Sequence, residues 1–120
     1  MKYIAVVTLS LVCVAVIGEN VPLGGLGKTK PATPEIQELV DSMRGDILRK
    51  LPPGYAGGQD LLLNAHSYRQ QVVAGMNYFI KIETGHMRFI HVRIYKDLDD
   101  VASVFGVQLQ KSREDSIEYF

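Results

Sequence analysis

Cysteine is almost absent from this sequence of 120 residues. The single cysteine, Cys13, lies in an apolar run near the amino terminus. If that run is removed, the mature chain holds no disulfide and no thiol. Small secreted domains often rely on disulfides, so the core and the sheet must be sufficient here without them. A cysteine nucleophile, a thiolate metal site and a redox motif are also excluded from the mature chain.

Net charge is absent as well, since 13 Lys and Arg residues balance 13 Asp and Glu residues. Such a balance gives no electrostatic reason to expect nucleic acid or an anionic membrane surface as partner. Hydrophobic residues make up 47% of the sequence, which is enough for a packed core rather than a disordered chain. The length fits a single domain.

The apolar run at residues 3–17 has the features of a secretory signal peptide. It follows a basic start at Lys2 and is about 15 residues long, short of the ~20 that span a bilayer. Gly18 is a small residue suited to the position before a cut, so we expect residues 1–18 to be a signal peptide. An uncleaved membrane anchor is the alternative, and the polar residues that follow the run argue against it. We therefore expect residues 19–120 to be secreted, extracellular and free of the membrane.

The mature chain begins with a predicted arm and a predicted helix. Glycine and proline are too dense in residues 19–33 for helix or sheet, so this segment is expected to be a flexible arm. Thr33 is a good N-cap and Pro34 suits the first helical position. Pro52 ends the pattern. One helix face collects the apolar residues that recur at spacings of three and four: Ile36, Leu39, Val40, Met43 and Ile47.

After Gly57-Gly58 the hydrophobic period changes from 3.6 to two. Strand patterns are found at residues 61–73, 76–83, 89–95 and 103–110, separated by short turns. One helix followed by four such strands indicates an α+β fold, with an antiparallel meander packed on the helix. The last two residues, Tyr119-Phe120, either pack on the sheet or hang free.

The segment Gln71-Val72-Val73-Ala74-Gly75 is unusual for a hairpin turn. Valine and alanine stand where asparagine or glycine would be favoured. An exposed apolar tip often indicates a partner.

This pentapeptide is the signature of the cystatin family, and four further segments resemble the disulfide-free branch of that family, the stefins. They follow one another in the stefin order and the resemblance covers essentially the whole mature chain. The segments are Gly24–Leu26, Lys30–Gln37, Asn77–Lys81 and His91–Lys96.

The resemblance implies a fold and a function. The fold is one long helix wrapped by a curved antiparallel sheet of four to five strands. The function is reversible, tight-binding inhibition of papain-like cysteine proteases of the cathepsin type. Such a protein is no enzyme and needs no cofactor. Residues 19–120 would be the cystatin domain, monomeric, with a domain-swapped dimer as the alternative if the first hairpin opens.

The resemblance also implies a wedge of three pieces that enters the active-site cleft of the protease. The glycine arm supplies the first piece, with Gly24 as the reactive-site glycine. Two hairpins supply the others. The implied protease-binding residues are Leu23, Gly24, Gln71, Val72, Val73, Ala74, Gly75, Leu98 and Asp99.

Two features depart from the stefin pattern. Stefins usually carry Leu-Pro at the second hairpin, whereas here Leu98 precedes Asp99 and Asp100. Loss of the proline is expected to loosen the tip, and the carboxylates add a desolvation cost, which together predict weaker or more selective inhibition. The signal peptide is the second departure, because stefins are mostly intracellular. It indicates a secreted setting such as a gland, gut, venom or parasite secretion.

Other functions have less support in the sequence. His66, His86 and His91 fall on different predicted strands or turns without matching carboxylates, so structural or surface roles are expected rather than a metal site. A calcium loop at residues 97–100 lacks the regular spacing and distal glutamate of an EF-hand, so a solvated turn is expected. A hydrolase would need a nucleophile and a base, which are not recognisable. The remaining alternative is a non-inhibitory secreted binding module on the cystatin fold, such as an antimicrobial or immune ligand.

Overall fold

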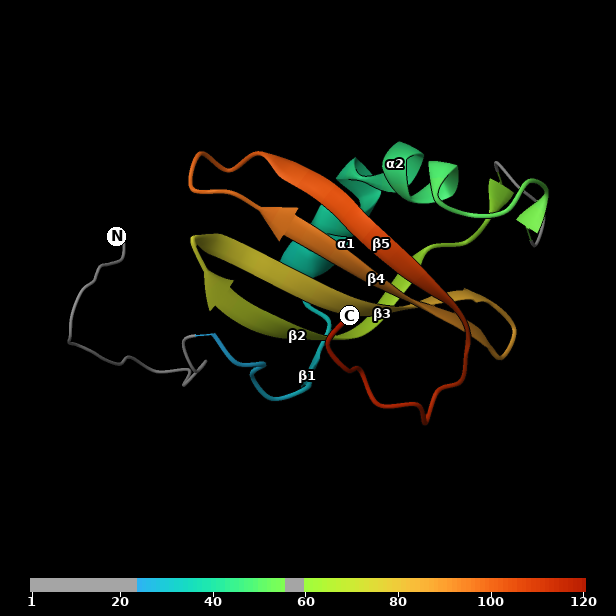
Figure 1. Cartoon of the computed structure of the whole chain (residues 1–120). Coiled ribbons are helices and arrows are strands. Elements are labelled where there is room, and N and C mark those ends of the chain that lie inside the picture. Colours follow the sequence, from blue (N-terminus) through green and yellow to red (C-terminus); the bar gives the residue numbers. More distant parts are fainter. Residues whose placement is uncertain (1–23, 56–59) are drawn as a thin grey trace.

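The protein folds as an antiparallel sheet with two helices against one face, shown in Figure 1. The computed structural model describes residues 24–55 and 60–120, so the predicted signal peptide and the first residues of the arm lie outside the described residues. The α+β fold and the sheet of up to five strands are confirmed. The elements are β1 (Lys30–Pro31), α1 (Pro34–Ser42), α2 (Arg44–Arg49), β2 (Asn64–Val73), β3 (Gly75–Gly85), β4 (Arg88–Lys96) and β5 (Ala102–Lys111), and the strand order is β1-β2-β3-β4-β5.

The helix starts where the sequence predicts, but it is not one long helix. The Thr33 hydroxyl accepts a hydrogen bond from the Ile36 N–H at 3.2 Å, which caps α1. A break at Met43 separates α1 from α2. Just before the break, the Ser42 hydroxyl donates to the Leu39 carbonyl at 2.8 Å, which competes with the helical ladder. Gly45 just after the break further lowers the helix propensity.

The break leaves the predicted apolar face of the helix intact. Val40 and Ile47 lie on either side of it, and both are fully buried. The middle strands of the sheet supply the facing side of this core. Its fully buried sheet residues are Ile80, Ile82, Ile90, Val92 and Ile94.

The opposite face of the sheet is covered by the tail, which we define as residues 112–120 (Figure 1). Phe79 on β3 is fully buried there, and its ring centroid lies 5.8 Å from those of both Tyr119 and Phe120. The Lys81 ammonium donates to the Arg113 carbonyl. The two terminal aromatic residues therefore pack on the sheet, which settles the question that the sequence left open.

Two features are absent from the residues that the structure describes. Within residues 24–55 and 60–120, no helix is long and apolar enough to cross a membrane. In the same part of the chain, no group of three or more His, Cys, Asp and Glu side chains is arranged to hold a metal ion.

Candidate functional site

Three segments far apart in the sequence meet at one end of the sheet, at the left of Figure 1. The turn between β2 and β3 lies beside the loop between β4 and β5, because Met76 and Lys96 pair across the two middle strands. Gly24 joins them, since its N–H donates to the Val72 carbonyl at 3.0 Å. We call residues 24–27, 71–75 and 97–101 together the loop edge.

The first hairpin of the loop edge is braced against β4. Gly75 has φ +107°, and a Cβ at this position would overlap the Lys96 carbonyl oxygen and lie 3.0 Å from the Asp97 Cα. The Tyr95 hydroxyl donates to the Ala74 carbonyl. The turn is therefore held in one shape, and it leaves Val73 38% exposed at its tip.

The arm continues the sheet along the outer edge of β2. The Gly27 N–H donates to the Gln70 carbonyl at 2.8 Å, and Leu26 pairs with Gln71 as an isolated bridge. Further along, the two residues of β1 pair with β2. The part of the predicted arm from Gly24 onward is thus hydrogen-bonded to β2, whereas Leu23 lies outside the described residues. Flexibility of the whole arm stays a prediction.

Gln71 connects the arm to the middle of the sheet. Its Nε2 donates to the Gly24 carbonyl at 3.0 Å, and its Oε1 accepts from Asn77 Nδ2 at 2.8 Å. Asn77 is only 3% exposed and was not among the predicted site residues. The sequence did hold a signal for it, because residues flanking a tight hairpin at equal distances face one another on the same side of the sheet.

The second hairpin is held by Asp97 rather than loosened, which corrects the expectation from the missing proline. Asp97 Oδ1 accepts from the N–H groups of Asp99 at 2.8 Å and Val101 at 2.9 Å. The backbone N–H of Asp97 donates to the Val101 carbonyl, and the backbone N–H of Asp100 donates to the Asp97 carbonyl. An aspartate in the first position of a turn provides this order without proline.

The shape of this second hairpin brings two apolar side chains to its surface. Leu98 is 79% exposed and Val101 is 61% exposed, one on each side of the acidic pair. The predicted residues Leu98 and Asp99 therefore lie at the tip, as a solvated turn. Val101 and the bracing Asp97 were missed as site residues.

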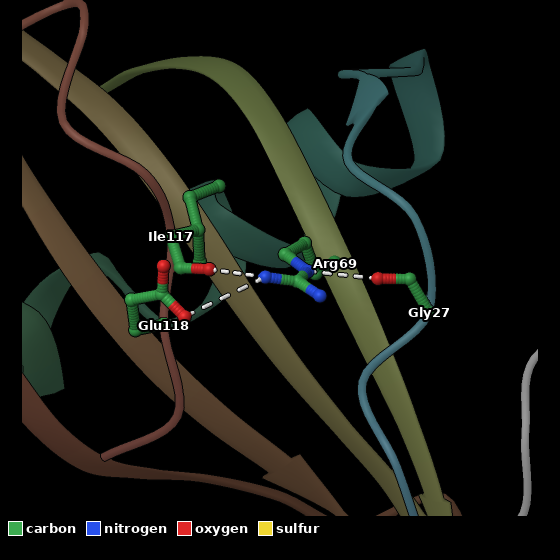
Figure 2. Close-up of polar contacts among 4 residues, drawn as sticks. All are labelled: Gly27, Arg69, Ile117 and Glu118. Atoms are coloured by element: carbon green, nitrogen blue, oxygen red, sulfur yellow. Dashed lines mark hydrogen bonds and ion pairs between the residues drawn. The ribbon is translucent and has the colours of Figure 1, made fainter.

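Arg69, two residues before Gln71 on β2, ties the arm to the tail, as Figure 2 shows. Its Nε donates to the Gly27 carbonyl at 2.8 Å, and one terminal nitrogen donates to the Ile117 carbonyl at 2.6 Å. The same nitrogen lies 4.0 Å from the Glu118 carboxylate. The arm is thus fixed by two neighbouring side chains of one strand.

Known proteins are similar to this chain in sequence. A family model described as "Cystatin domain" matches residues 57–110, which include both hairpins. The human protein Cystatin-A is 37% identical over 100 residues, which cover 81% of this chain and 97% of the relative. The chain belongs to the cystatin family.

Other relatives extend this result across distant organisms. Leukocyte cysteine proteinase inhibitor 1 of Sus scrofa is 33% identical over 105 residues, covering 85% of this cystatin and 97% of the relative. Cystatin-A3 of Dictyostelium discoideum is 39% identical over 89 residues, which cover 74% of this chain and 88% of the relative. The stefin-like resemblance of the sequence is confirmed, and this cystatin, like its family, is not an enzyme.

What the loop edge of this cystatin offers is shape rather than reactive groups. It presents backbone at Gly24, apolar side chains at Val73, Leu98 and Val101, and the two carboxylates of the second tip. His66 on β2 and His91 on β4 lie outside the loop edge, and so does His86, which is in the turn between β3 and β4. Such an edge can fill a groove in another protein.

Proposed function

We propose that this cystatin is a reversible, tight-binding inhibitor of papain-like cysteine proteases, which inserts the loop edge into the active-site cleft. One observation carries the proposal: the arm and the two hairpins are joined into a single edge by hydrogen bonds and close packing before any partner binds. The printed name of the Sus scrofa relative, a cysteine proteinase inhibitor, supports the same activity.

Each piece of the edge has a role in this proposal. Gly24 brings backbone without a side chain to the catalytic centre, and its φ of +80° turns the chain away from the nucleophile, so that no peptide bond is aligned for attack. Leu23, just before it, would occupy an apolar pocket on the non-primed side. Val72, Val73 and Ala74 would bury apolar surface against the cleft wall, and Leu98 with Asp99 would contact the other side.

The energetics favour tight binding. Both hairpins are ordered by the sheet, so little conformational entropy is lost when they bind. The contact is expected to match a standard protease–inhibitor interface of ~1,600 Å². No covalent step by this chain is required.

The activity can be tested by titrating papain with the purified protein and following a fluorogenic peptide substrate. We expect stoichiometric loss of protease activity. Val73→Asp is a suitable comparison, because the exposed tip tolerates a carboxylate while the apolar contact is lost, and its inhibition should be much weaker. Full papain activity at micromolar wild-type protein would contradict the proposal and revive the non-inhibitory binding module.

We also propose that the protein is secreted after cleavage following Gly18 and that it is monomeric. The basic start and short apolar run support the first point. Amino-terminal sequencing of protein recovered from the medium of expressing cells should begin at Glu19. Light scattering should give the mass of one chain, and a mass twice as large would favour the domain-swapped dimer.

A further inference from the structure

A buried amide lies under the loop edge. Asn77 is on β3, directly opposite Gln71 in the register of β2 and β3, and is 3% exposed. Its Nδ2 donates to Gln71 Oε1, but its Oδ1 has no hydrogen-bond partner among the residues that the structure describes. A buried polar atom without a partner destabilises a fold, so this amide needs an explanation other than stability.

The explanation lies in Gln71, the hydrogen-bond partner of Asn77. The carboxamide of a glutamine has one end that accepts and one end that donates. Because Asn77 donates to the oxygen of Gln71, the nitrogen of Gln71 must face outward, and it meets the Gly24 carbonyl at 3.0 Å. The Gly24 carbonyl can only accept, so it requires the nitrogen end of Gln71, and Asn77 Nδ2 supplies the donor that the inner oxygen of Gln71 then needs.

Gly24 is held on both sides by this arrangement. Its N–H donates to the Val72 carbonyl at 3.0 Å, while its carbonyl accepts from Gln71. The residue is exposed and has φ +80°. A free glycine populates positive and negative φ about equally, so nothing intrinsic holds it in this conformation. Fixing it before binding removes an ordering cost from the complex.

We propose that Asn77 is a positioning residue for inhibition, which acts through Gln71 to fix Gly24 in the conformation that enters the protease. This inference rests on the proposed inhibitory function. Asn77 itself is too buried to contact a protease, so any effect of its replacement on inhibition must be transmitted through its neighbours.

The first test is Asn77→Asp. A carboxylate at this position accepts but cannot donate, so the Gln71 amide is expected to turn its nitrogen inward and its oxygen toward the Gly24 carbonyl. Two acceptors then face each other and the arm is released. Amide hydrogen exchange at Gly24 should become faster, and the inhibition constant against papain should rise about 3- to 10-fold.

The matched control is Asn64→Asp. It makes the same change of charge on an exposed residue at the start of β2, the end of that strand away from the loop edge. Its inhibition constant and its Gly24 exchange should equal those of the wild-type protein. If Asn64→Asp weakened inhibition as much as Asn77→Asp, a general effect of charge would explain both and the inference would fail.

The second test is a double-mutant cycle with Gln71→Ala, which removes the connection between Asn77 and the arm. On this background, Asn77→Asp should add no further loss of inhibition. Losses that simply multiply would show that Asn77 acts on the hairpin independently of Gln71, which overturns the inference. Asn77→Leu removes the donor without adding a charge, so it serves if Asn77→Asp does not fold.

These outcomes separate this inference from the function on which it rests. If the wild-type protein inhibits papain and the Asn77 variants inhibit equally well, the positioning role is wrong and the inhibitory function stands. If the wild-type protein does not inhibit, the function is wrong and the role in inhibition falls with it. Exchange at Gly24 then still reports whether Asn77 fixes the arm.

Discussion

At the scale of single residues, Gly75 decides how closely the two hairpins approach. Its φ of +107° is strained for any residue with a side chain, and the carbonyl of Lys96 occupies the space where a Cβ would lie. The Tyr95 hydroxyl is also only 3.1 Å from that point. The missing side chain therefore lets the first hairpin rest directly on the start of the second.

Gly75→Ala should lower the free energy of unfolding by about 1–3 kcal/mol and weaken protease inhibition, because the hairpins must move apart. Urea unfolding and papain titration measure the two effects. Gly54→Ala is the matched control, since Gly54 has φ +74° but nothing lies within 4 Å of its added Cβ. It should lose only the conformational part, about 1 kcal/mol. Equal losses in both variants would show that the packing against Lys96 is unimportant.

At the scale of elements, the sequence predicts what local patterns determine. The Thr33 cap, the helix face and the two hairpins follow from neighbouring residues and are confirmed. The break at Met43 was not predicted, because apolar periodicity continues through it while a side-chain hydrogen bond from Ser42 competes with the ladder. Burial of Lys81 was missed for a different reason: the Lys81 ammonium donates to the Arg113 carbonyl of the tail, which returns from far along the chain.

The candidate site likewise has features that local sequence predicts and features that depend on distant contacts. The resemblance to the family predicts the tips of both hairpins and Gly24 as site residues from short segments. It could not show that the arm pairs with β2, since that pairing joins residues more than 40 positions apart. Asp97 was overlooked because its role depends on the conformation of the loop rather than on its residue type. Selectivity from the acidic tip stays a prediction.

The second hairpin gives a prediction at this scale. Asp97→Ala removes the acceptor of the Asp99 and Val101 N–H groups, so the exposed loop should lose its fixed shape. We expect faster dissociation from papain with about 1 kcal/mol or less of change in the free energy of unfolding. Asp97→Asn keeps an oxygen that can accept both bonds and should restore slow dissociation. If Asn and Ala behaved alike, the charge of Asp97 rather than its turn would be responsible.

At the scale of the whole molecule, the sheet lies between the helices and the tail. His91 is buried on the face of the sheet that the tail covers. It is 0% exposed, and both ring nitrogens lack a hydrogen-bond partner within the described part of the chain. Lys81 lies opposite it on β3 and Gln108 opposite it on β5, with Lys111 and Asp115 also nearby. Burial, and then the positive charges of the two lysines, lower the pKa of His91 from 6.5 to about 4.

This burial predicts a loss of stability in acid. Between about pH 6.5 and pH 4 the unfolded chain binds a proton at His91 that the folded chain does not, so the free energy of unfolding falls as the pH falls. The loss should approach at most about 3 kcal/mol and level off below pH 4. His91→Leu should remove most of this dependence, whereas replacement of the exposed His86 by leucine should leave it unchanged. Urea unfolding at pH 7, 5.5 and 4 measures it, and an unchanged slope in His91→Leu would mean that other groups destabilise this cystatin in acid.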